Sequence, residues 1–182
     1  HIVRKVCADM QADCVIDVMP WPRAQIETEA GNYNALFVVG WNADREEWLY
    51  FSSPLMETEY GFFERIGDQG AIENYDHIRS LEGKNIIVYG PSNTATRLSA
   101  LQDSAKDLNI SFEIDQYTKN SVSIKKLIMK RADLLFSNRD AGFALITKAK
   151  QNDKIRYIGP AFPPHHYYVG FTKNRKGNAK VF

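Results

Sequence analysis

Arg45 is the residue of this sequence best placed to bind an anion. It stands in a turn after the apolar run 35–39, a pattern typical of a strand buried on both faces of a parallel sheet. Asn42 would cap a short helix there and hold the guanidinium at the carboxyl end of the strand, where open α/β sheets bind ligands. A guanidinium can grip a carboxylate or phosphate through two parallel hydrogen bonds. The alternative is a solvated Arg45 that pairs with Asp44 or Glu46.

A second candidate anion site is the turn after the predicted strand 85–89. This turn carries Ser92, Asn93 and Thr94, whose polar side chains stand beside the free N–H groups of a helix start. It is not a P-loop, because the required Gly-Lys-Ser/Thr is missing. An ordinary capped turn between a strand and a helix is the alternative.

Trp21 and Asn138 also follow predicted strands. Trp21 stands between two prolines, and its ring could offer a face to a ligand, although most such rings pack against the protein. Asn138 could contact a ligand or act only as the N-cap of the next helix.

Few residues of this chain indicate an enzyme. Neither Cys7 nor Cys14 has a nearby histidine that could activate it, and the adjacent His165 and His166 are not spaced to share one metal ion. No paired carboxylates recur at the ends of the predicted strands. We therefore expect a protein that is not an enzyme and that uses neither a cofactor nor a metal.

The composition excludes several kinds of partner. The 182 residues include 23 basic and 22 acidic side chains, a net charge of +1 without a basic stripe, so nucleic acid is not an expected partner. No apolar run approaches the roughly 18 residues of a membrane helix. Hydrophobic residues at 44% and charged residues at 25% are ordinary for a soluble globular protein.

Strand and helix patterns alternate in two series, which predicts an α/β fold with mostly parallel sheets. The first series has a strand at 14–18, a helix at 22–30 and the strand 35–39. The second series begins at residue 83, and its helices follow three of the strands predicted at 85–89, 112–114, 133–136 and 155–158. A last strand is predicted at 166–171.

The two series predict two lobes with a cleft between them. The stretch 56–82 separates the series, and we expect the proline-rich segment at 160–164 to return the chain to the first lobe. We expect residues 1–57 plus 166–182 in the first lobe and 58–165 in the second. Two crossings between the lobes suit hinge closure around a small ligand.

Cys7 and Cys14 are separated by a six-residue connection between a predicted helix and a predicted strand. A turn of that length can bring the two Cα atoms within disulfide range, and a pair of reduced core residues is the alternative. A bridge would imply an oxidising compartment.

Several short motifs, in their order along the chain, resemble the type 3 extracellular solute-binding proteins of bacterial amino-acid uptake systems. The resemblance spans nearly the whole chain. Its motifs are Asp44-Arg45-Glu46, Phe51-Ser52 with Pro54-Leu55, Leu81-Glu82-Gly83-Lys84 followed by a strand and Ser92, Lys130-Arg131-Ala132-Asp133, and the spacing of Cys7 and Cys14.

The resemblance implies a two-lobed, type II periplasmic-binding fold and a ligand site between the lobes. Arg45 would hold a ligand carboxylate, Trp21 would lie against the ligand, and Gly40 stands where family members often place a hydroxyl residue. Ser92, Asn93 and Thr94 would meet the carboxylate from the second lobe. The resemblance also implies a disulfide between Cys7 and Cys14, and an N-terminal strand and C-terminal helix beyond this sequence.

Asn138 falls where the family places the acid that holds an α-ammonium group. A buried ammonium needs an acceptor and preferably a charge, so this neutral residue argues against an ordinary α-amino acid. Asp140 could replace the acid only with a shifted backbone.

The resemblance implies a monomeric periplasmic protein that delivers a small solute to the membrane permease of an ABC-type importer. The alternative is the extracellular ligand-sensing domain of a signalling receptor, anchored in the membrane.

Overall fold

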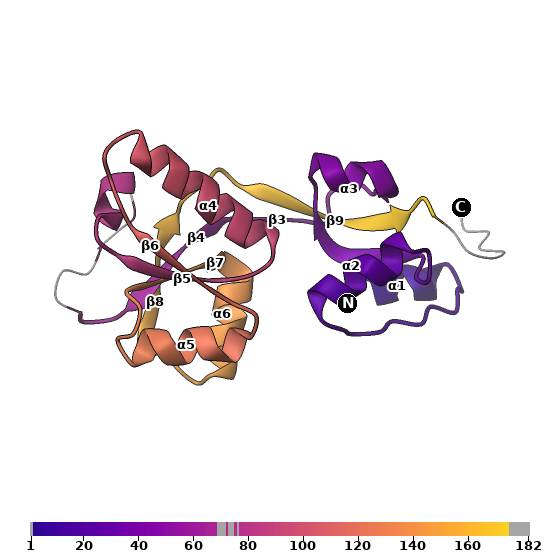
Figure 1. Ribbon diagram of the computed structural model, residues 1–182. Coiled ribbons are helices and arrows are strands. Elements are labelled where there is room, and N and C mark those ends of the chain that lie inside the picture. Colours follow the sequence, from indigo (N-terminus) through magenta and orange to yellow (C-terminus); the bar gives the residue numbers. More distant parts are fainter. Residues whose placement is uncertain (1, 69–71, 73–74, 76, 175–182) are drawn as a thin grey trace.

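The computed structural model describes residues 2–68, 72, 75 and 77–174, and it has two lobes that each contain one β-sheet (Figure 1). Residues 175–182, which we expected in the first lobe, lie outside the described part. In the sheet of the first lobe three strands pair with β9: β1 (Ala35–Gly40), β2 (Leu49–Phe51) and β3 (Met56–Thr58) all run antiparallel to β9 (His165–Thr172).

The second lobe has a five-stranded mixed sheet. Its order is β6 (Glu113–Tyr117), β5 (Asn85–Tyr89), β7 (Leu134–Asn138), β4 (Tyr60–Arg65) and β8 (Ile155–Pro160). β5 runs parallel to both β6 and β7, whereas β4 runs antiparallel to β7 and β8. The two-lobed α/β fold expected from the sequence is therefore confirmed.

Helices cover both faces of this second sheet. Because side chains alternate across a strand, Ile86 and Val88 of β5 face one core cluster and Ile87 faces the other. The first cluster is closed by α4 (Asn93–Lys106) and the 3-10 helix η1 (Ile78–Leu81), and the second by α5 (Asn120–Ile128) and α6 (Arg139–Lys148). The sheet is thus the middle layer of three.

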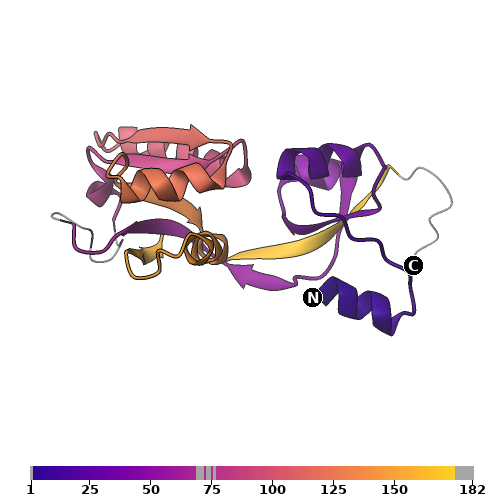
Figure 2. The same ribbon diagram turned by 90° about the horizontal axis from the view of Figure 1, so that it is seen from below.

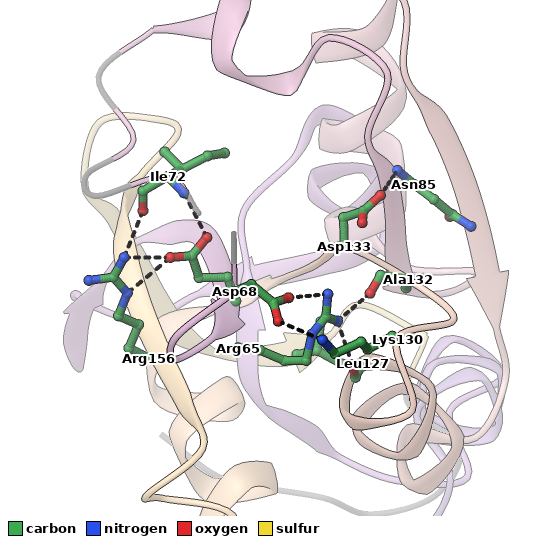
Figure 3. A network of polar contacts seen from close by, with 10 residues as sticks. Arg65, Asp68, Ile72, Asn85, Leu127, Lys130, Ala132, Asp133 and Arg156 are labelled. Atoms are coloured by element: carbon green, nitrogen blue, oxygen red, sulfur yellow. Dashed lines mark hydrogen bonds and ion pairs between the residues drawn. The ribbon is translucent and has the colours of Figure 1, made fainter. Parts of the chain in front are cut away.

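A polar network holds the end of this sheet that lies away from the first lobe (Figure 3). The buried Glu64 accepts hydrogen bonds from Arg156, at 2.6 and 2.9 Å, and from the Ile72 N–H at 2.9 Å. Arg65 pairs with Asp68 and donates to two carbonyl groups, one in the last turn of α5 and one between α5 and β7. A carboxylate buried beside a guanidinium and a backbone donor is well compensated.

Asp133, from one of the sequence motifs, has a structural role in the same region. Its Oδ2 accepts a hydrogen bond of 2.8 Å from the Asn85 N–H, which ties the start of β7 to the start of β5 (Figure 3). The motif therefore fixes the register of two parallel strands.

The first lobe has a smaller core. Leu36, Val39 and Leu49 are its buried apolar residues among those described, packed under α2 (Trp21–Glu29) and α3 (Ala43–Trp48). The helix α1 (Ile2–Asp9) has no buried residue and stands off the sheet in Figure 2. Among the described residues no helix is long and apolar enough to cross a membrane.

Two predictions for the first lobe differ from the structure. Residues 14–18 form no strand, because no described strand pairs with them and Val15 and Val18 are 80% and 98% exposed. The sheet is not parallel, because β1 pairs with a strand that returns from the second lobe in the opposite direction. Phe37 and Val38 of β1 are accordingly half-exposed rather than covered on both faces. An apolar run alone does not define strand direction.

Cys7 and Cys14 form a disulfide, with their Cα atoms 6.1 Å apart. The bridge joins α1 to the segment that follows it, and it therefore ties down a helix that the core does not hold. The expected pairing is confirmed.

Candidate functional site

A cavity of about 260 Å³ lies between the lobes, and all seven residues expected to bind ligand line it. From the first lobe come Trp21, Gly40 and Arg45, and from the second Ser92, Asn93, Thr94 and Asn138. Sequence reasoning missed the rest of the lining: Val38, Tyr60, Tyr89, Leu135, Phe136, Ser137, Ala141, Leu145 and Tyr167. A cavity of this size suits a small ligand.

Arg45 is held in the cavity wall by local structure on both sides. Asn42 caps α3 and accepts a hydrogen bond of 2.8 Å from the Arg45 N–H. The side chain is 6% exposed, and its guanidinium donates to the Gly40 carbonyl at 2.9 Å and to Gln25 Oε1 at 2.8 Å. The expected N-cap is confirmed, and the two side-chain hydrogen bonds set the direction of the guanidinium.

The alternative of a solvated ion pair does not hold for Arg45. Among the described residues no carboxylate forms an ion pair with it, and Asp44 is exposed at the surface. Burial lowers the pKa of Arg45, but an arginine remains charged under all ordinary conditions. The first lobe therefore presents a buried cation whose charge no described carboxylate neutralises.

Trp21 contacts the guanidinium itself. The Arg45 Cζ atom lies 5.3 Å from the centre of the Trp21 ring, within the range of a cation–π interaction. The proline at the start of α2 fixes the backbone next to this ring. Trp21 thus positions Arg45 in addition to lining the cavity.

The turn of the second lobe is a capped helix start, as one reading of the sequence proposed. Ser92 Oγ accepts from the Ala95 N–H at 3.2 Å and donates to the Tyr89 carbonyl at 2.6 Å. The cap leaves the first turn of the fourteen-residue helix α4 beside the cavity. The partial positive charge of a helix N-terminus favours an anion there.

A hydrogen bond joins the start of α3 in the first lobe to the start of α4 in the second. Asn42 Nδ2 donates to Asn93 Oδ1 at 3.3 Å. Asn42 thus serves both α3, through its oxygen, and the opposite lobe, through its nitrogen.

Asn138 lines the cavity, and each polar atom of its side chain already has a protein partner. Its Oδ1 accepts from the Ala141 N–H at 3.0 Å as the N-cap of α6, and its Nδ2 donates to Thr58 Oγ1 at 2.7 Å. Thr58 in turn donates to Asp140 Oδ2 at 2.7 Å. Asp140 does not line the cavity, so the shifted backbone that would bring it there is not observed.

Two tyrosines form the side of the cavity near the crossings, and the ring of His165 packs beside both of them. The hydroxyls of Tyr60 and Tyr167 lie 2.9 Å apart, and burial raises the pKa of Tyr167. Arg97 of α4 lies over the Tyr60 ring and 3.3 Å from His165 Nδ1. The pKa of His165 is lowered, mainly by burial and then by Arg97.

These aromatic residues had a weak signal in the sequence. Tyr60 opens β4 and Tyr167 lies in β9, both at points where the chain crosses between lobes. Only the positions of the crossings would have singled them out from other tyrosines. No group of three or more potential metal ligands occurs among the described residues.

Comparison with known proteins supports the fold and leaves the family open. No protein-family model matches the chain, and no curated protein matches it. An ancestral arginine-binding protein bound to arginine has 15% identity and a TM-score of 0.76 over 94% of this chain and 72% of its own.

Two further solved structures have similar folds and different roles. An amino acid ABC transporter substrate-binding protein from Streptococcus pneumoniae, bound to L-arginine, has 14% identity and a TM-score of 0.72, over 94% of this chain and 68% of its own. A histidine kinase sensor domain with similarity to periplasmic binding proteins has 12% identity and a TM-score of 0.77, over 94% and 70%. This chain therefore has the two-lobed fold of the periplasmic solute-binding proteins.

Proposed function

We propose that the chain binds a small carboxylate-bearing, amino-acid-like solute between its lobes and delivers it to the permease of an ABC-type importer. The observation that carries this proposal is the buried Arg45, a cation without a described carboxylate partner in the wall of the cavity. A ligand carboxylate would neutralise the charge of the guanidinium and accept hydrogen bonds from its N–H groups. The N-terminus of α4 would meet the same group from the other lobe.

We further propose that residues 1–57 plus 166–182 move against 58–165 when the ligand binds. The cavity takes its lining from both sides of this division, so a ligand that touches both lobes favours the closed arrangement by its differential affinity. The protein would act as a periplasmic monomer and would catalyse no reaction.

A sensing domain is the second candidate, favoured by the similar fold of the histidine kinase sensor domain. Both roles share the binding step and differ in the partner that recognises the closed state, a permease in one case and a signalling domain in the other. Loss of solute uptake in a strain that lacks the protein would support the transporter role, and loss of a signalling response without loss of uptake would support the sensor.

Calorimetry tests the binding step directly. Amino acids, hydroxy acids and simple organic acids are titrated into the protein, each beside its neutral amide or methyl ester. At least one carboxylate should bind while its neutral partner does not. Arg45→Ala should lose about 2–5 kcal/mol of binding free energy, the scale for truncating one partner of a buried charged contact.

The control is Arg23→Ala, which removes an arginine of the neighbouring helix α2 whose side chain is 69% exposed. Circular dichroism shows whether each variant is folded. Equal binding by the acid and its ester, or full affinity in a folded Arg45→Ala, would contradict the proposal.

A further inference from the structure

We infer that the cavity selects a carboxylate with an apolar or aromatic body and without an ammonium group. This inference rests on the proposed function and names the class of solute that the same site takes. Three observations support it: the positive charge in the cavity lining, the partners that the nearest carboxylates already have, and the apolar side chains of the remaining walls.

The charge in the described lining of the cavity is positive. Arg45 is the one charged residue of the described lining, which contains neither aspartate nor glutamate. Arg97 stands behind the lining, 5.0 Å from the Tyr60 ring. The N-termini of α4 and α6 also face the cavity, through Ser92 to Thr94 and through Asn138 and Ala141. An ammonium group in the cavity would meet the Arg45 guanidinium and the positive ends of two helix dipoles.

Four acids are next to lining residues in the chain. Asp44 and Glu46 are exposed beside Arg45, and the other two, Asp140 and Glu59, have partners of their own. Asp140 accepts from Thr58 at 2.7 Å and lies 3.7 Å from Arg139 Nε. Glu59 pairs with Arg139 at 3.1 Å. Asp140 and Glu59 therefore already have partners outside the cavity.

Asn138 cannot take the role of an acid in this arrangement. Its oxygen accepts from the Ala141 N–H, and its nitrogen is a donor, which an ammonium group would repel. Hydroxyl and carbonyl oxygens elsewhere in the wall can accept a hydrogen bond but supply no charge. Burial of an ammonium group without a compensating charge is costly, whereas a hydroxyl or hydrogen in its place avoids that cost.

The remaining walls of the cavity suit an apolar body. Five aromatic rings and three aliphatic side chains line it: Trp21, Tyr60, Tyr89, Phe136, Tyr167, Val38, Leu135 and Leu145. A carboxylate at Arg45 would leave the rest of a ligand against these walls. Burial of apolar ligand surface would then provide much of the affinity.

Two matched ligand series test the inference by calorimetry. The aromatic series is 3-phenylpropanoate, 3-phenyllactate and phenylalanine, which differ only in a hydrogen, a hydroxyl or an ammonium group at one carbon. The branched series is 4-methylpentanoate, its 2-hydroxy acid and leucine. In at least one series, an acid without the ammonium group should bind at least about tenfold more tightly than the amino acid.

A variant pair tests the cause. Ala141 lines the cavity in the first turn of α6, where an added carboxylate also suits the helix dipole. Ala141→Asp should move the preference at least about tenfold towards the amino acid. Ala141→Asn adds the same bulk without charge and should change all ligands of a series alike. Equal shifts in both variants would overturn the inference.

The outcomes separate this inference from the proposed function. Equal or tighter binding of phenylalanine or leucine overturns the inference and leaves solute binding intact. Binding by other carboxylates of the panel, with none from either series, also overturns it. If no carboxylate binds at all, the proposed function itself fails.

Discussion

The two lobes reach their stability by different means. In the second lobe, helices close both faces of a five-stranded sheet, and two clusters hold 13 and 8 buried residues among those described. In the first lobe, the described cluster holds three, and much apolar surface stays exposed. Val15, Val18, Ile26 and Met10 are all more than half exposed.

This difference indicates that the second lobe forms the more stable wall of the cavity and the first lobe the less stable one. Stability in a protein is not uniform, and regions with few buried apolar contacts open most easily. The first lobe depends on a disulfide, on β9 and on contacts with the other lobe for much of its order. Arg45, the centre of the proposed site, therefore lies in the less stable half.

A matched pair of phenylalanine truncations measures the contrast between the lobes. Phe62 of β4 is 0% exposed and Phe37 of β1 is 38% exposed. Phe62→Ala should lower the free energy of unfolding by about 3–5 kcal/mol, because it leaves a cavity in a packed core. Phe37→Ala should cost well under half as much. Urea unfolding compares the two, and similar losses would contradict the contrast.

Removal of the disulfide should affect the first lobe by a smaller amount. The seven-residue separation of Cys7 and Cys14 closes a short loop, which gives about 2–3 kcal/mol on the chain-entropy model. We expect Cys7→Ser with Cys14→Ser to increase amide hydrogen exchange in the first lobe and to leave β5 and β7 protected. An equal loss of protection in both lobes would show that the two lobes unfold together as one cooperative unit. Thiol titration of the unfolded, unreduced protein should find no free thiol.

The hydrogen bond between Asn42 and Asn93 should contribute less still, and its contribution should be to ligand affinity. Asn93→Ala removes the acceptor of Asn42 Nδ2, and Asn42→Ser removes the donor while keeping an oxygen that can cap α3. Each should weaken ligand affinity by about 0.5–1.5 kcal/mol, the usual net value of one hydrogen bond, with little change in unfolding. Surface plasmon resonance should show the loss in the dissociation rate. Faster dissociation in only one of the two variants would mean that this bond is not the cause.

The smallest expected effect is a pH dependence from His165. Its pKa is lowered in the folded state, so the unfolded chain binds the proton more readily. The stability that this group contributes is fully present above its unfolded pKa, about 6.5, and is lost as the pH falls through the folded value. His165→Asn should flatten the fall in melting temperature between pH 7.5 and 5, whereas His166→Asn, at an exposed neighbour, should not. An unchanged profile in His165→Asn would contradict this assignment.

The sequence was most informative where local chemistry decides the structure. Asn42 and Asn138 were identified as helix caps, and Arg45 was placed at the end of its strand, because caps and strand ends depend on a few neighbouring residues. The turn at Ser92 followed from the same rules. All seven expected ligand residues line one cavity, although their binding of a ligand remains a prediction.

The sequence was least informative where distant pairing decides. Residues 14–18 have the composition of a strand but no described neighbour to pair with, and β1 is antiparallel because β9 returns from another lobe. Hydrogen bonding between strands depends on segments far apart in the chain, which local patterns do not encode. Tyr60 and Tyr167 were missed for the same reason, since their contact spans more than a hundred residues.

The pairing of β9 has a consequence for how the protein is made. Each strand of the first sheet pairs with residues 165–172, although β1 is finished by residue 40. At about 5–20 residues per second, a ribosome needs roughly 6–25 seconds to add the intervening chain. During that time β1, with its apolar run, has no partner strand, while the strands of the second sheet are completed by residue 160. A chaperone that binds residues 35–40 during synthesis should therefore raise the yield of folded protein more than one that binds the second lobe.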